Sequence, residues 1–299
     1  MSFVVARSSH AVLNFILATF ALIALTLVLA SSASAQQDNF ANGDGHDGNV
    51  TFNAAGTFSP NAVAPIPGAL TAGATSVTIG TVRAGAGANA VGFANNRLVM
   101  IYQSNGTSAT PTSADQTAYP LSTSTAGHWE FARASTVAGS VLTLSAPLIY
   151  NYPAGTAQAI AVPEWANLTV SNAGVNITAQ NWNGSSGGVV SVLVQTLASF
   201  TAAGTVSANS AGFRGGIAYN ENAGATTDCP TTQYNAPSVA APYANKGEGF
   251  YTAGYTASTP ATTTTQAGRG NYIHAGGGGN CFNAGGGGGG NGGQGGLGG

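Results

Sequence analysis

The fold is decided by "NLTVSNAGVNITAQNWNGSSGGVVSVLVQTLASFTAAGTVSA", residues 167–208. Short runs of β-branched and apolar residues alternate here with corners of Asn, Gly and Ser, a pattern typical of strands and turns. The runs occupy residues 167–170, 175–179, 188–200 and 204–208. Strands that return at such short intervals favour the stacked coils of a β-solenoid, in which each coil buries its apolar face against its neighbours. A β-sandwich would give a similar string, so both architectures stay open.

The region before these coils, residues 50–165, also predicts strands, and no helical period is sustained. Strand-like runs lie at 50–52, 76–82 and 97–103. The runs "HWEFARAST" and "SVLTLSAPL", separated by "VAG", predict a hairpin. We expect Glu130 and Arg133 to be outward-facing strand residues. The predicted fold is therefore all-β, a short-strand β-sandwich or β-solenoid-like domain with a glycine-rich C-terminal tail.

The N-terminus predicts export. An apolar run at 11–30 is followed by "SSASAQQ", in which Ala33 and Ala35 form an A-x-A pattern. This pattern predicts a signal peptide over residues 1–35, cleaved before Gln36. The alternative is an uncleaved segment that anchors the chain in a membrane, because the run approaches the roughly 20 apolar residues needed to span one.

Residues 36–49 form a polar, turn-rich segment that we expect to be an exposed lead-in. Asp44 and Asp47 are its candidate metal ligands, since the spacing superficially resembles a calcium loop. The glutamate and flanking helices of an EF-hand are missing, however, so a hydrated turn is the better prediction. We expect no cofactor.

The C-terminal part divides into a Tyr/Asn/Gly-rich excursion, 217–275, and a glycine-rich tract, 276–299. Export makes a disulfide between the two cysteines, Cys229 and Cys281, the default expectation. The tract lacks the lysine, hydroxyl and helix of a phosphate-binding loop. It is either a flexible coil or a bundle of extended chains, whose backbones can approach closely because glycine has no Cβ.

Composition excludes several classes of function. Charged residues make up 5% of the chain, far below the usual quarter, and no basic patch is present. Nucleic acid and anionic membrane surfaces are therefore poor partners. No nucleophile motif is found, and the acidic residues are scattered, so we expect no catalytic residues and no enzyme. A polysaccharide-cleaving solenoid would need Glu130, Glu164 and Glu221 to converge.

Six segments carry a resemblance to a known group. "GDGHDGNVTF", "RLVMIYQSNG", "GHWEFARASTVAGSVLTLSAPLIYNY", "AQAIAVPEWANLTV", "ITAQNWNGSSGGVVSVLVQ" and "VSANSAGFRGG" occur in this order over residues 43–299. The chain thereby resembles exported bacterial glycine-rich surface proteins, some of them adventurous-gliding-motility type proteins. The resemblance implies a β-rich region followed by a glycine-rich region. It implies no catalytic residues.

These features predict a secreted or cell-surface structural protein of adhesin type, with gliding-related attachment as one role. Tyrosines of the excursion are candidate contacts for sugars or surfaces, because their rings combine apolar area with a polar tip. They are Tyr219, Tyr234, Tyr243, Tyr251 and Tyr255. The alternative is that these tyrosine side chains serve only to pack the excursion itself and bind no ligand. The alternative function is an extracellular polysaccharide-binding or polysaccharide-cleaving β-solenoid. The oligomeric state stays open.

Overall fold

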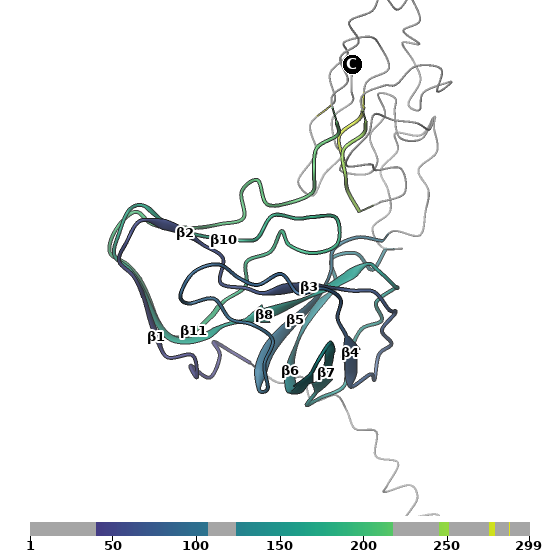
Figure 1. Ribbon diagram of the computed structural model, residues 1–299, viewed down its shortest axis with the longest axis horizontal. Coiled ribbons are helices and arrows are strands. Elements are labelled where there is room, and N and C mark those ends of the chain that lie inside the picture. The colour runs from purple at the N-terminus through teal and green to yellow at the C-terminus, as the bar shows by residue number, and fades with distance from the viewer. Residues whose placement is uncertain (1–39, 107–123, 218–244, 251–274, 279–286, 288–299) are drawn as a thin grey trace, which may run out of the picture. The chain divides into compact units, whose positions relative to one another are not determined.

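The computed structural model describes residues 40–106, 124–217, 245–250, 275–278 and 287 (Figure 1). These residues form twelve strands and no helix, which confirms the all-β prediction. Among them, no helix could cross a membrane. The predicted signal peptide, both cysteines and the five candidate tyrosines lie outside the described residues.

Six strands form three stacked coils. One parallel sheet has the order β1-β9-β11, from β1 (Asn49–Phe52), β9 (Glu164–Val170) and β11 (Leu193–Phe200). The other has the order β12-β10-β2, from β2 (Gly56–Phe58), β10 (Val175–Thr178) and β12 (Thr205–Ser207). Each coil is therefore a strand, a corner and a second strand, as the solenoid interpretation predicts for 166–216.

The first coil is where the structure departs from the sequence prediction. Residues 50–58 were expected to belong to the separate N-terminal region and Asn49 to the polar lead-in, but β1 and β2 pair directly with the middle coil. Asn49 is opposite Asn167, and Gly56 is opposite Val175. The sequence around a strand does not show which distant strand it will pair with. Each strand has the same alternation of apolar and polar residues whichever partner it has.

The coils enclose an apolar core. Phe52 packs against Phe58 with ring centroids 4.7 Å apart and against Trp165 at 6.1 Å. The other buried members are Val50, Leu168, Val170, Val175 and Ile177. All three coils contribute, because the partly buried Val194 of β11 also packs here. This shared core holds the coils in register.

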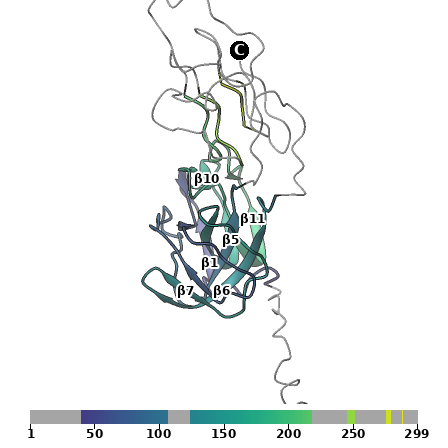
Figure 2. The same ribbon diagram turned by 90° about the vertical axis from the view of Figure 1, so that its right-hand side faces the viewer.

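An antiparallel sheet is inserted between the first and second coils. Its order is β3-β8-β5-β6-β7-β4. The strands are β3 (Val63–Ile66), β4 (Ser76–Thr78), β5 (Arg97–Gln103), β6 (Trp129–Ala138), β7 (Val141–Leu144) and β8 (Ala157–Val162). The predicted hairpin is confirmed as β6–β7, and β5 has the predicted bounds. The views in Figures 1 and 2 show this sheet beside the coils rather than within them.

Buried amide side chains join the sheet to the coils. The Asn61 side chain donates to Ala161 O at 2.8 Å and to Ser191 O at 2.6 Å, and it accepts from Ser191 N at 3.1 Å. Gln158 accepts from Gly187 N at 2.7 Å and donates to Gly187 O at 2.9 Å. These bonds satisfy backbone groups that would otherwise be buried without partners.

The expectation that Glu130 faces outward was wrong. Glu130 is only 6% exposed, because it shares its face of β6 with buried Ala132 and Ala134. Its carboxylate accepts hydrogen bonds from Ile149 N at 2.8 Å, Tyr150 N at 3.1 Å and the Tyr152 hydroxyl at 3.0 Å. Burial, together with the charge and hydrogen bond of Glu130, raises the pKa of Tyr152. Glu130 thus fixes the loop after β7.

The described glycine-rich segments lie side by side (Figure 1). Glu248 N donates to Arg214 O at 2.9 Å, and Asn245 N donates to Ile217 O at 3.0 Å. Two further bonds of 2.9 Å run from Gly247 N to Gly276 O and from Gly287 N to Gly277 O. Backbone hydrogen bonds thus link separate stretches of the chain in this described portion, while most of the predicted tract at 276–299 lies outside the described residues.

Candidate functional site

Residues 40–48 are held against the middle coil by closely spaced glycines. Gly43 and Gly45 have φ of 85° and 73°, a conformation that favours glycine. A Cβ on Gly43 would also lie 3.2 Å from the Glu164 Cβ and 3.0 Å from the Leu193 Cβ. The segment therefore passes directly over the start of β9.

The prediction of an exposed lead-in was wrong for Asp47, whose side chain is only 14% exposed. Asp47 accepts a hydrogen bond from Glu164 N at 2.8 Å, and its own N–H donates to Glu164 O at 3.1 Å. Its carboxylate also forms an ion pair with Arg97 of β5. Polar composition predicted solvent contact, but the Asp47 side chain has partners 50 and 117 residues away along the chain.

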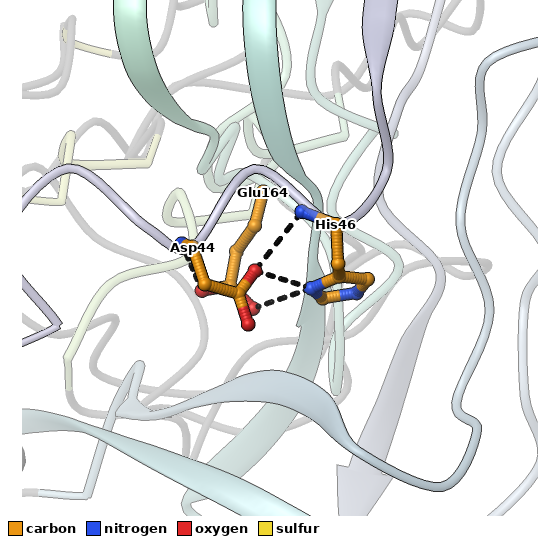
Figure 3. Close-up of side chains that lie close together, drawn as sticks. All are labelled: Asp44, His46 and Glu164. Carbon is orange, nitrogen blue, oxygen red and sulfur yellow. Dashed lines mark hydrogen bonds and ion pairs between the residues drawn. The ribbon is translucent and has the colours of Figure 1, made fainter.

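Three side chains meet at this point: Asp44, His46 and Glu164 (Figure 3), which we call the acid cluster. His46 Nδ1 lies 2.5 Å from Asp44 Oδ1 and 3.5 Å from Glu164 Oε2. Asp44 Oδ1 also accepts from His46 N at 3.1 Å, and Asp44 N donates to Glu164 Oε1 at 3.2 Å. Asp44 was a candidate ligand from the sequence alone, but its contact with Glu164, 120 residues away, was not predicted.

Arg133 neutralises the buried member of the acid cluster. Its guanidinium donates to Glu164 Oε2 at 2.8 Å and to Glu164 Oε1 at 2.9 Å, a bidentate arrangement. It also lies 3.7 Å from Asp44 Oδ2. The Glu164 side chain is 0% exposed and that of Arg133 is 18% exposed. The outward-facing position expected for Arg133 was therefore wrong, since the side chain turns toward the coils to pair with Glu164.

Asp44 is the carboxylate of the cluster that reaches solvent, with its side chain 52% exposed. Partial burial raises the pKa of its carboxyl. Hydrogen bonds from the backbone and ring of His46 and the charges of His46 and Arg133 outweigh this, and the pKa lies below its ordinary value. Asp44 is thus ionised at neutral pH.

The cluster is poorly suited to hold a metal ion. Its ligand atoms lie within 4.8 Å of one another, which is close enough to share an ion. Both Glu164 oxygens, however, already accept hydrogen bonds from Arg133. A cation would have to displace a guanidinium from its paired carboxylate, at the cost of leaving that charge buried.

An aromatic strip, which we define as Trp129, Phe131 and Phe40, leads to the acid cluster. Trp129 and Phe131 are 5.4 Å apart between ring centroids, and Phe131 and Phe40 are 5.9 Å apart. The Arg133 Cζ lies 5.5 Å from the Phe40 centroid. Trp129 is 51% exposed. The strip therefore runs from an open indole ring to the arginine that pairs with Glu164.

Strand geometry explains the strip. Trp129, Phe131 and Arg133 occupy alternate positions of β6 and so share one face. A count by two along the strand groups these three residues and separates them from Glu130, although Glu130 and Arg133 were both expected to face outward. Phe40 could not be found this way, because it joins the strip only through the fold.

More apolar surface lies around the start of β6. The His128 and Tyr150 rings have centroids 4.7 Å apart. Tyr150 and its neighbour Ile149 are both exposed. Exposed apolar groups rimmed by polar ones are typical of binding surfaces.

No family model matches the chain, and no curated protein matches it. Among solved structures, the tailspike protein gp49 from Pseudomonas phage LKA1 matches 45% of this chain and 27% of its own, with 14% identity and a TM-score of 0.22. The Pseudomonas phage phi297 tailspike gp61 matches 56% of this chain and 24% of its own, with 16% identity and a TM-score of 0.24.

A third structure is the Gp54 tailspike of Acinetobacter baumannii bacteriophage AP22 in complex with A. baumannii capsular saccharide. It matches 52% of this chain and 24% of its own, with 11% identity and a TM-score of 0.23. The chain spans about a quarter of the length of these structures. TM-scores this low do not establish a shared fold.

Proposed function

We propose that this protein is an exported saccharide-binding protein that attaches to an extracellular polysaccharide without cleaving it. The observation that carries the proposal is the exposed Trp129 of an aromatic strip that ends at the acid cluster. Sugar rings have apolar C–H faces and polar edges. A site with an open aromatic ring beside carboxylate and imidazole groups offers partners to both.

The rigidity of the platform supports binding. Trp129 and Phe131 stand on the part of β6 that pairs with β5, and the same strand continues into its pairing with β7 from Ala134 onward. A binding group held on a sheet loses little conformational entropy when a ligand arrives. Tyrosines on the long excursion would add contacts, as the sequence predicts.

The contacts of the carboxylates support binding without cleavage. Glycoside hydrolysis needs two carboxyl groups on either side of the scissile bond, one of them free to donate a proton. Glu164 is bound at both oxygens by Arg133, and Glu130 accepts three hydrogen bonds from the loop at residues 149–152. Neither carboxyl group is free for acid–base chemistry in these positions.

Export is the second part of the proposal, and the sequence supports it through residues 1–35. A low content of charged residues and the resemblance to glycine-rich surface proteins fit the same location. Attachment to a polysaccharide at the cell surface, including during gliding, is the role that joins these features.

Binding would be measured with the secreted full-length protein on a panel of soluble and insoluble polysaccharides, by affinity electrophoresis and sedimentation. We expect Trp129→Ala to weaken binding by about tenfold or more, equivalent to about 1.4 kcal/mol. Trp129→Phe, which keeps a ring, should retain most of it.

Leu197→Ala is the matched control, because Leu197 is an exposed apolar residue of β11 outside the strip. It should bind as the wild type does. Equal binding by Trp129→Ala and wild type would refute the strip as the site. Release of reducing ends from any bound polysaccharide would refute the absence of cleavage.

A further inference from the structure

The charge at the end of the aromatic strip points to a class of saccharide, and this inference rests on the proposed function. We propose that the ligand carries free amino groups, as a polymer of amino sugars does, and that the Asp44 carboxylate is the specificity-determining residue. The aromatic strip would supply affinity for sugar rings in general. Asp44 would distinguish amino sugars from N-acetylated and acidic ones.

Asp44 lies at the Phe40 end of the strip. The chain turns between them, with Gly43 N donating to Phe40 O at 2.6 Å. Arg133 contacts both ends of this turn, 5.5 Å from the Phe40 centroid and 3.7 Å from Asp44 Oδ2. A sugar that stacks along the strip would therefore reach the Asp44 carboxylate with a neighbouring ring.

Exposure of one carboxylate, rather than the net charge of the region, favours a cationic ligand. The carboxylates of Asp44, Asp47 and Glu164 face two guanidinium groups and the His46 ring, whose nitrogens lie 2.5, 3.6 and 3.5 Å from them, respectively. Glu164 and Asp47 are mostly shielded from solvent and have arginine partners. The negative charge that a ligand meets is that of Asp44, which is half exposed while Arg133 is mostly covered.

Each class of saccharide would meet this carboxylate differently. An ammonium group would form an ion pair with it, and a hydroxyl or acetamido group would only donate a hydrogen bond. A uronic acid would place like charge against it and would be disfavoured. Because Asp44 is partly solvated, the ion pair should change affinity only about two- to fivefold at low salt.

The test compares oligomers of glucosamine and N-acetylglucosamine of equal length and linkage, with oligogalacturonate as the acidic probe, by calorimetry on the full-length protein. We expect the wild type to bind the glucosamine oligomer about two- to fivefold more tightly than its acetylated partner, with oligogalacturonate weakest. The preference should shrink as salt is raised.

Four variants separate the contributions. Asp44→Asn should bind both glucosamine-based oligomers equally, while Asp44→Glu should keep the preference. Asp115→Asn removes the same charge from another part of the chain and should behave as the wild type. Trp129→Ala should weaken binding of both oligomers.

The outcomes distinguish the two proposals. Equal or tighter binding of the acetylated or acidic oligomer by the wild type would overturn the amino-sugar inference and leave saccharide binding standing. A preference that survives Asp44→Asn would also overturn it. Failure of all three oligomers, and of the polysaccharide panel, would overturn the proposed function itself.

Discussion

The Arg133–Glu164 pair gives the sharpest test of how the inserted sheet is joined to the coils. Arg133→Met keeps most of the apolar stem of the side chain but removes the guanidinium. Glu164, whose side chain is 0% exposed, would then lose its guanidinium partner. It would keep the hydrogen bond from Asp44 N and the His46 ring, whose Nδ1 lies 3.5 Å from Glu164 Oε2. Removing one partner of a buried ion pair costs about 3–5 kcal/mol. Since Arg133 is itself partly exposed, we expect about 3 kcal/mol.

That loss is a large part of the 5–15 kcal/mol typical of a folded domain. It would be measured by urea unfolding, followed through tryptophan fluorescence, to which the buried Trp165 beside Glu164 in the chain contributes. A lower midpoint at an unchanged slope would report the loss of stability.

The double variant Arg133→Met/Glu164→Leu is the control. It removes both charges, so no carboxylate is left buried without a partner, and stability should recover to within about 2 kcal/mol of the wild type. A loss below about 1 kcal/mol for Arg133→Met would refute the reasoning. So would a double variant less stable than either single one.

Three further predictions concern other parts of the structure. Burial lowers the pKa of Lys246 from 10.5 to about 7, so between these values the unfolded chain binds a proton that the folded chain does not. Stability should therefore rise with pH there, by at most about 5 kcal/mol; Lys246→Met should flatten this pH dependence in urea titrations, and an unchanged slope would contradict the assignment. Glu130→Leu leaves the three donors of the 149–152 loop without their acceptor and should cost about 3 kcal/mol or more, seen as a lower Tm, whereas a neutral result would show that water replaces the carboxylate. A Cβ on Gly216 would lie 1.9 Å from Asn245 O, so Gly216→Ala should separate these segments and speed hydrogen exchange at 245–248; unchanged exchange would argue against their close approach.

Parts of the fold could be read from local pattern. Strand β5 and the β6–β7 hairpin followed from alternation and a glycine turn, and both were found where expected. Strand β4 is shorter than the predicted 76–82, ending at Thr78. The coils at 167–208 followed from short apolar runs between Asn and Gly corners. Such features depend on neighbours in sequence, so the sequence contains the information for them.

The site could not be read in the same way. Its members come from the 40–48 segment, from β6 and from β9, and no spacing along the chain joins Phe40 to Phe131 or Asp44 to Glu164. Alternation in β6 shows that two faces exist. It does not show which face the core covers, which is why Glu130 was expected to face solvent.

The sequence by itself therefore determined the all-β class, the turns and the strands that local alternation specifies. Only the tertiary structure decided that residues 49–58 complete the solenoid, that Arg133 pairs with Glu164, and that Trp129 stays open at the end of an aromatic strip. The physical reason is that a strand or a turn is specified by the conformational preferences of adjacent residues. A coil partner, a buried ion pair and an exposed ring depend on which distant surfaces meet when the chain folds.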